Sequence, residues 1–216
     1  MHIAILTFQG FNELDSLVAL AVLNRIRKSD WHVTLCSPER SVTSMNGVTV
    51  QGQSTLDQIP GADAVIVGSG VKTREIANDP AIISTLRLDP TRQLIAAQCS
   101  GALILARLGL LANVPACTDL TSKPWVQDAG VEVLDQPFYA SGNIATAGGC
   151  LASPYLAAWI IARTEGEDAA RNALHYVAPV GEKDEYVARA INNIAPYLPK
   201  KNTAPEPTCE KGLSSW

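Results

Sequence analysis

Residues 94–111 constrain the fold of this chain more than any other segment. Residues 94–98 are apolar enough for a short buried strand, and residues 102–110 carry apolar side chains on nearly every face of a helix. Only the tight turn at residues 99–101 separates the two. A buried strand that passes directly into a buried helix is typical of an α/β sheet covered on both faces. We therefore expect this unit to lie at the centre of such a sheet.

The central residue of that turn is Cys99. A sharp strand-to-helix turn resembles a nucleophile elbow, which lifts its central residue above the start of the following helix. Gly101 removes a Cβ where strand and helix crowd each other, and the helix N-terminus favours thiolate over thiol. This predicts a reactive cysteine. The alternative is a buried structural cysteine, since free cysteines are among the most buried residues.

Composition indicates an ordinary globular chain of one domain. The chain has 216 residues, of which 47% are hydrophobic and 18% charged, so it can bury a sizeable core. A net charge of −4 and the lack of basic runs predict neither nucleic acid nor a membrane surface as a partner. The five dispersed cysteines lack C-x-x-C spacing. This argues against a disulfide framework and a zinc site, and favours a reducing cytoplasm.

Strand and helix patterns alternate along the chain. Short apolar segments predict strands, and segments with helical spacing predict helices. The expected strands are residues 2–8, 31–37, 62–67, 94–98, 116–118, 131–134, 138–140 and 144–147, with a small hairpin or edge strand within 42–53. The expected helices are residues 11–28, 81–88, 102–110, 123–130, 153–164 and 167–177. This order predicts a single-domain α/β fold, in which a mostly parallel sheet lies between helices.

The active site of such a fold lies at the carboxyl ends of the strands. Five loops then meet at one crevice: residues 9–15, 68–70, 99–100, 118–119 and 148–150. From residue 196 the composition shifts to Pro, Lys, Thr and Glu. We expect an α/β domain at residues 1–197 and a C-terminal tail at residues 198–216 that is poorly ordered unless a partner binds it.

Four motifs, in their order and spacing, resemble the ThiJ/PfpI superfamily. They are FNELDSL after the first strand, VIVGSG, AAQCSGALILARLGLL with the elbow cysteine, and NIATAGGCLAS. The resemblance covers nearly all of residues 1–180 and implies a flavodoxin-like fold, akin to the class I glutamine amidotransferases. Within the superfamily the chain is most similar to the isonitrile hydratase branch, in which an Asp after the first strand stands beside the elbow cysteine. By position that residue is Asp15.

The resemblance also implies roles for residues. Cys99 is the nucleophile and Asp15 its acidic partner, although an Asp at a helix start is also favoured by the helix dipole alone. A carboxyl group in a dry pocket has a raised pKa and can donate a proton. The N–H groups of Gly70 and Ser100 form an anion-binding pair. Further candidates to contact substrate are Thr118, Asp119, Gly149 and Cys150.

Three features depart from the family pattern. Ser100 stands where peptidase-like members have His, Thr118-Asp119 where the most similar branch has Thr-His, and Gly68-Ser69-Gly70 where Pro-Gly-Gly is usual. We expect the three histidines to be structural. Cys150 is either a small buried hydrophobe or a resolving thiol close to Cys99.

The resulting hypothesis is a cysteine-dependent hydratase that converts a small isonitrile to an N-substituted formamide without metal or organic cofactor. We expect Leu14 and Leu17 to contribute an apolar wall for the substrate. The alternatives are glyoxalase- or deglycase-like chemistry on reactive carbonyls, and a non-catalytic sensor in which Cys99 is oxidised. The resemblance further implies a homodimer.

Overall fold

A six-stranded sheet forms the middle layer of the molecule, in the strand order β2-β1-β5-β6-β8-β7. The computed structural model describes residues 1–199. All neighbouring strands are parallel except β7 and β8. The strands are β1 (His2–Leu6), β2 (His32–Cys36), β5 (Ala64–Val67), β6 (Leu94–Gln98), β7 (Phe138–Ser141) and β8 (Ile144–Ala147). The predicted mostly parallel α/β sheet is confirmed.

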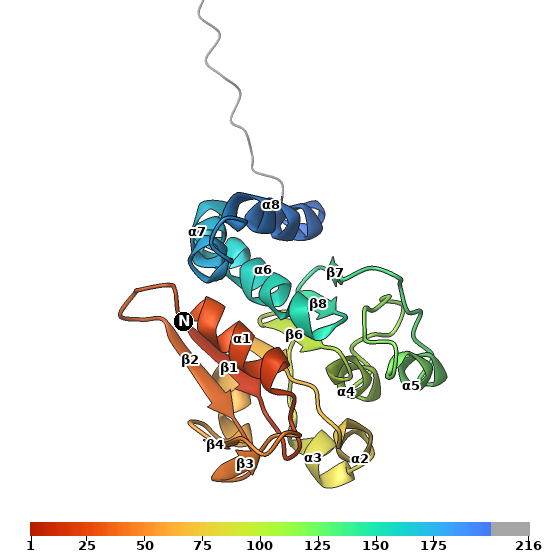
Figure 1. Ribbon diagram of the computed structural model, residues 1–216. Helices are drawn as coiled ribbons and strands as arrows, with labels where there is room; N and C mark the ends of the chain where they lie inside the picture. The colour runs from red at the N-terminus through yellow and green to blue at the C-terminus, as the bar shows by residue number, and fades with distance from the viewer. Residues whose placement is uncertain (200–216) are drawn as a thin grey trace, which may run out of the picture.

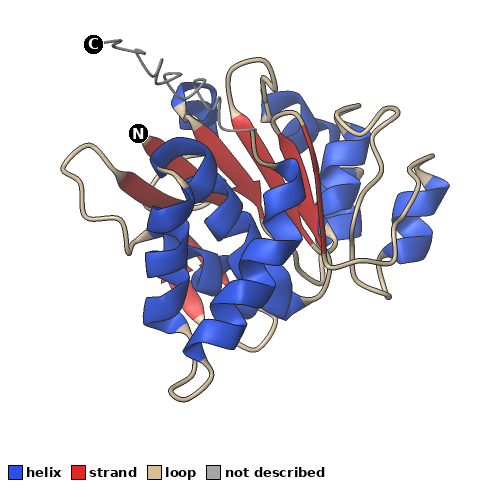
Figure 2. Ribbon diagram, turned by 90° about the horizontal axis from the view of Figure 1, so that it is seen from above, coloured by secondary structure: helices blue, strands red, loops and turns tan. Residues whose placement is uncertain are grey.

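Helices cover both faces of this sheet (Figures 1 and 2). One layer contains α1 (Glu13–Leu23), α6 (Ser153–Glu165), α7 (Glu167–Val177) and α8 (Lys183–Ile194). The other contains η1 (Leu56–Gly61), α2 (Thr73–Ala77), α3 (Pro80–Thr85), α4 (Gly101–Arg107) and α5 (Lys123–Asp128). Two short 3₁₀ turns, η2 (Cys150–Ala152) and η3 (Ala195–Tyr197), precede α6 and follow α8.

Side chains of the central strands alternate between two hydrophobic cores. In β1, Ile3 and Ile5 face the α1/α6 layer, whereas Ala4 and Leu6 face the α4 layer. All four are essentially inaccessible to solvent. Because successive residues of a strand point to opposite faces, burial on both sides requires a continuous apolar run, as the sequence of β1 provides.

Several elements differ from the sequence prediction. The helix expected at residues 11–28 spans only Glu13–Leu23, because the Asn12 side chain caps its start and Asn24 ends it. The strands expected at residues 116–118 and 131–134 reduce to a single bridge between Ala116 and Val133. The segment 42–53 forms a separate antiparallel hairpin, β3 (Ser41–Thr43) with β4 (Thr49–Gln51).

Two helices were not predicted, the short α2 and the longer α8. Leu198, placed in the expected tail, packs against the core beside Tyr197. The rest of that expected tail, residues 200–216, lies outside the described residues. Within residues 1–199 no helix combines the length and hydropathy that crossing a bilayer requires.

Candidate active site

The turn between β6 and α4 forces Cys99 into a strained backbone conformation. Its φ is 47°, a value that side-chain-bearing residues rarely adopt. Its N–H donates to the Ala147 carbonyl of β8 at 2.8 Å, which fixes the turn to the sheet. A Cβ at Gly101 would lie 2.5 Å from the Val67 carbonyl oxygen, so only glycine fits there. The predicted elbow, and the reason for its glycine, are confirmed.

A pocket of about 380 Å³ opens above this elbow. Residues from all five predicted loops line it, together with Val71, with Met45 of the β3–β4 hairpin, and with residues of α5 and of the segment that leads into it. The lining residues are Asn12, Met45, Ser69, Gly70, Val71, Cys99, Ser100, Asp119, Thr121, Ser122, Trp125 and Cys150. The convergence of loops at the carboxyl edge therefore occurs as the strand order predicts.

Two of the residues predicted to contact substrate, Thr118 and Gly149, do not line the pocket. The Thr118 hydroxyl donates to the Cys99 carbonyl at 2.8 Å. The Gly149 carbonyl accepts a hydrogen bond from the Gln98 amide at 2.8 Å. Both residues therefore hold the elbow in place from the side of the protein, whereas Gly70, Ser100, Asp119 and Cys150 face the pocket with Cys99.

Asp15 lies beneath the pocket in a cluster with Cys99 and Cys150. One carboxylate oxygen and the two sulfur atoms all lie within 4.8 Å of one another. Asp15 is fully buried. Its Oδ2 accepts a hydrogen bond from the Ser69 hydroxyl, whereas its Oδ1 has no hydrogen-bond donor within residues 1–199. Burial raises the pKa of Asp15 despite the opposing hydrogen bond from Ser69, as expected for a carboxyl group in a dry pocket.

The pKa of the Cys99 thiol differs from the sequence prediction, which expected it to be lowered. Burial is the largest influence, and the charge of Asp15 the next; both raise the pKa of Cys99. The Gln98 amide, 3.5 Å from the sulfur, lowers it too little to compensate. The expectation that the helix N-terminus favours thiolate is therefore wrong for the resting site. Two buried acids in contact cannot both ionise, so the pair retains a proton.

Of the two N–H groups predicted to bind an anion, that of Gly70 already has a hydrogen-bond partner within the protein. The Gly70 N–H points to the Ser100 hydroxyl oxygen at 3.4 Å, and the Ser100 hydroxyl lies 2.8 Å from that of Thr73. Thr73 in turn donates to the Gly70 carbonyl at 2.8 Å. Each hydroxyl has one proton, so these contacts close a ring in which Ser100 donates to Thr73. The Ser100 N–H, at the cap of α4, does not donate in any of the turn and loop hydrogen bonds of the described residues and remains a candidate donor.

The sequence analysis missed Asn12. Its Oδ1 accepts the Leu14 N–H at 3.1 Å, which leaves its Nδ2 to donate to the Cys150 sulfur, also at 3.1 Å. An Asn before an amphipathic run is a recognisable helix cap. The second contact joins residues 138 apart, so no local pattern could reveal it.

The apolar part of the pocket also differs from expectation. Leu14 and Leu17 line a separate groove, bounded by α1, Val177 and Tyr186, because their positions on α1 turn them away from the carboxyl edge. Met45, Val71 and Trp125 provide the apolar surface of the pocket instead. Met45 lies in the hairpin and Trp125 in α5, elements that the sequence did not associate with the site.

None of the three histidines lines this pocket. His2 contacts the Thr34 hydroxyl at 2.8 Å, and His32 and His175 are exposed elsewhere. Within the described chain, the only cluster of three or more His, Cys, Asp or Glu side chains close enough to share a metal ion is Asp15, Cys99 and Cys150. The site thus combines a strained thiol, a second thiol and a buried carboxyl group without a cation among its lining residues.

Comparison with known proteins identifies the fold and the family. Three solved structures illustrate the likeness. A ThiJ/PfpI family protein from Pseudomonas syringae aligns with a TM-score of 0.73 and 17% sequence identity. The alignment covers 90% of the present chain and 87% of the Pseudomonas protein. A cysteine-to-alanine mutant of the DJ-1 superfamily protein STM1931 from Salmonella typhimurium aligns with a TM-score of 0.70 and 25% sequence identity. The alignment covers 82% of the present chain and 97% of the Salmonella protein. Oxidized Toxoplasma gondii DJ-1 aligns with a TM-score of 0.68 and 18% sequence identity, and the alignment covers 82% of the present chain and 97% of the Toxoplasma protein.

No curated protein matches the chain in sequence. The family model of the DJ-1/PfpI family, however, matches residues 1–163, which include every residue of the cluster and pocket described above. This match spans about three quarters of the 216 residues. The chain therefore belongs to the DJ-1/PfpI family.

Proposed function

We propose that the protein hydrates a small, neutral isonitrile to an N-substituted formamide, with Cys99 as nucleophile and Asp15 as acid and base. The observation that carries this proposal is the contact between a strained thiol and a fully buried carboxyl group, in a pocket without histidine. Such a pair can move one proton back and forth without an imidazole. Membership of the DJ-1/PfpI family supports a cysteine-centred site of this kind.

The first half of the reaction forms a covalent intermediate. The Cys99 sulfur attacks the terminal carbon of R–N≡C while its proton passes through the Asp15 carboxyl group to that carbon. The product is a thioimidate, R–N=CH–S–Cys99. Attack by a neutral thiol is slow, so the carboxylate that accepts the proton during attack is essential in this mechanism.

The second half consumes one water molecule. Asp15 accepts a proton from the water as its oxygen attacks the thioimidate carbon, and the nitrogen receives that proton. Collapse of the adduct breaks the C–S bond, releases HC(=O)–NH–R and restores the thiol. The Ser100 N–H, from a residue that lines the pocket beside Cys99, is the backbone donor we assign to charge that develops during this step.

The lining of the pocket supports a neutral substrate. Met45, Val71 and Trp125 form an apolar surface, and no Lys, Arg or His is present to bind an anionic group. Asp119, which also lines the pocket, disfavours anions further. Substrates of the isonitrile class have no charge and match this environment better than phosphorylated or carboxylated carbonyl compounds.

A panel of alkyl and aryl isonitriles tests the proposal, with formamide formation as the readout. Cys99→Ala should reduce turnover by about 10³-fold or more, since it removes the nucleophile. Asp15→Asn, which keeps the shape but cannot move a proton, should reduce it by about 10² to 10⁴-fold. Cys117→Ser is the matched control, because this buried cysteine contacts Thr146 and lies outside the pocket.

Absence of formamide from the unaltered protein, while iodoacetamide still labels Cys99, would contradict isonitrile hydration. The same thiol could then be tested on small aldehydes, the chemistry of the carbonyl hypothesis, and with peroxide for the sensor hypothesis. We also propose a homodimer, as the family resemblance implies, and a location in the cytoplasm, which the dispersed cysteines without C-x-x-C spacing favour. Light scattering coupled to size exclusion tests the dimer.

A further inference from the structure

We propose that Asp15, Cys99 and Cys150 form a binding site for one thiophilic divalent cation, such as Zn²⁺ or Cd²⁺. The proposal goes beyond the proposed hydratase and does not depend on it. Two thiolates and a carboxylate are a ligand set that such cations prefer. The consequence is that the metal occupies the same sulfur that acts as nucleophile, so bound metal blocks the chemistry of Cys99.

The distances fit a common metal ion. All three ligand atoms lie within 4.8 Å of one another. In a tetrahedral zinc site with metal–sulfur bonds of about 2.3 Å, two sulfurs lie about 3.8 Å apart. Only a small closure of the cluster is therefore needed. Cys150 belongs to the three-residue turn η2, which follows Gly149 at a φ of 86°, so a short segment supplies this movement.

The Asp15 carboxyl group has an oxygen without a partner. Its Oδ1 is buried and accepts no N–H or O–H hydrogen bond within residues 1–199, whereas Oδ2 accepts one from the Ser69 hydroxyl. The thiols of Cys99 and Cys150 are the remaining neighbours, and their hydrogen bonds partly offset the rise in the pKa of Asp15. Buried polar atoms are nearly always paired, so an unpaired one at a functional edge calls for a ligand. This oxygen belongs to the residue that stands beside both sulfurs, and a bound cation would satisfy it.

Each proposed ligand already has a neighbour that orients it. Ser69 donates to Asp15, the Asn12 amide donates to the Cys150 sulfur at 3.1 Å, and the Gln98 amide donates to the Cys99 sulfur at 3.5 Å. Metal ligands in proteins commonly depend on such outer hydrogen bonds. The Asn12 amide cannot be turned over, because its oxygen accepts the Leu14 N–H. The three donors orient the ligand atoms and offset part of the rise in pKa that burial causes at Asp15, Cys99 and Cys150.

The fourth coordination position faces the pocket. Cys99 and Cys150 both line it, whereas Asp15 lies beneath. Water or a small thiol can therefore complete a tetrahedral geometry from the solvent side. On binding, each thiol releases its proton to solvent and its sulfur donates an electron pair to the metal. No oxidant or reductant takes part.

Cadmium titration of the full-length, reduced protein tests the site. Thiolate-to-cadmium charge transfer absorbs in the ultraviolet, and its intensity counts the thiolates bound. We expect saturation at one equivalent with the intensity of two thiolates. Cys150→Ser should halve that intensity and weaken binding at least 10-fold, and Asp15→Asn should weaken binding while the intensity stays at two thiolates. Cys117→Ser is the matched control and should leave both quantities unchanged.

A second measurement uses only the unaltered protein, in case a variant fails to fold. Cadmium should protect both Cys99 and Cys150 from alkylation, as read by peptide mass, and removal by a chelator should restore their reactivity. Failure to saturate, equal binding by Cys150→Ser, or protection of only one of the two cysteines would each overturn the proposal. Because no isonitrile is involved, failure here is distinct from failure of the hydratase hypothesis.

Discussion

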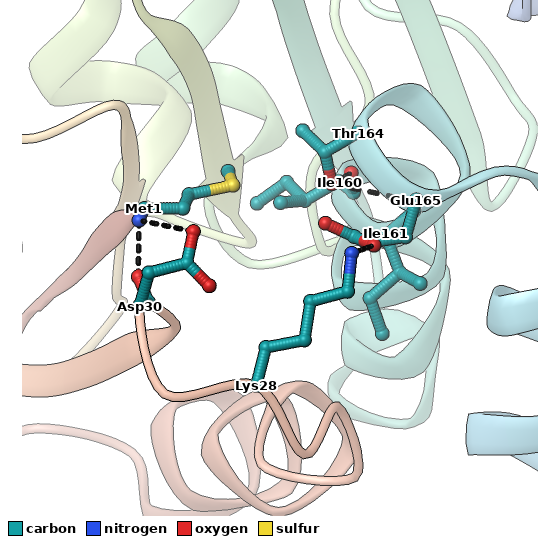
Figure 3. A network of polar contacts seen from close by, with 7 residues as sticks. All are labelled: Met1, Lys28, Asp30, Ile160, Ile161, Thr164 and Glu165. Carbon is teal, nitrogen blue, oxygen red and sulfur yellow. Dashed lines mark hydrogen bonds and ion pairs between the residues drawn. The ribbon is translucent and has the colours of Figure 1, made fainter.

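Polar side chains are paired differently at the two ends of the parallel strands. At the amino end, the Met1 amino group pairs with Asp30 and Lys28 pairs with Glu165 (Figure 3), and one side chain of each pair, Asp30 and Lys28, is largely exposed. Arg163 donates there to the Gly142 carbonyl at 2.7 Å and to the Asn143 side chain at 2.6 Å. At the carboxyl end, Asp15, Cys99 and Cys150 crowd together with little solvent and no cation among the pocket-lining residues.

Buried side-chain atoms without a hydrogen-bond partner are concentrated at the carboxyl end of the parallel strands. Among the described residues, four buried side-chain atoms have no hydrogen-bond partner, and three of them, in Asp15, Ser16 and Gln98, belong to the pocket edge or its immediate support. Strain and unpaired polar groups persist where the surrounding fold enforces them, and they cluster at functional sites. The difference between the ends is that polar groups are paired at the amino end, whereas backbone strain, close packing and unpaired polar atoms gather around the reactive cluster at the carboxyl end.

The largest expected effect concerns close packing at the carboxyl end. Gly101→Ala places a Cβ 2.5 Å from the Val67 carbonyl oxygen, and backbone cannot move aside as a side chain can. We expect a loss of about 3 kcal/mol in the free energy of unfolding, measured by urea denaturation. Gly142→Ala, at the amino end, is the control: its φ is 59° but its surroundings are open, so about 1 kcal/mol is expected. Equal losses would refute the contrast.

The next effect concerns the amino end. Arg163→Ala removes two hydrogen bonds from a charged donor and the packing of the guanidinium over Trp159, 5.3 Å from the ring centre. The expected loss in free energy of unfolding is about 2 kcal/mol. The rate of iodoacetamide labelling at Cys99 should stay the same, since Arg163 lies outside the pocket. A large change in that rate would show that the two ends are coupled.

Asp15→Asn should alter how stability depends on pH. The ordinary pKa of this acid is 3.8, and burial raises its value in the folded state. The folded protein therefore keeps a proton that the unfolded chain releases, so stability falls as pH rises from 3.8 through the folded pKa. The Asn variant lacks this loss. The difference in unfolding free energy between variant and wild type should grow with pH; a constant difference would argue against a raised pKa.

The smallest expected effect is that of Lys28→Ala. The Lys28 side chain is 56% exposed, and an exposed ion pair gains little because water screens it. The midpoint of urea denaturation should be unchanged within error, and added salt should not widen any difference. A clear loss of stability would mean that the network of Figure 3 holds the segment between α1 and β2 to α6 more strongly than its exposure indicates.

Local patterns predicted the elements best where the apolar signal is continuous. The bounds of β6 and α7 agree with the sequence prediction, because one is an uninterrupted apolar run and the other a clear amphipathic helix. Helix α8 also has helical spacing, with Val187, Ala190, Ile191 and Ile194 in the core, so its pattern was present although it was not predicted. Helix α2 has five residues, too few for any periodicity to appear.

The site was predictable only as far as the strand order. The rule that loops gather at the carboxyl edge brought Cys99, Asp119 and Cys150 together, but it contains no information about side-chain contacts. The hydrogen bonds from Asn12 to Cys150 and between Thr73 and Ser100 join distant residues through tertiary packing. The state of the Cys99 thiol depends on burial and on Asp15, and the local motif around the turn shows neither.

The position of β8 beside β6 has a consequence for how the protein folds. During synthesis the first 98 residues can pair β1, β2, β5 and β6, yet the strand that anchors the Cys99 amide and leads to Cys150 emerges about 50 residues later. Contacts of such wide sequence separation form late, since their loop closure must first be overcome. A chain that ends before β8 therefore contains Cys99 and Asp15 but lacks the Ala147 carbonyl and Cys150, so the three-residue cluster is complete only after the last parallel strand has docked.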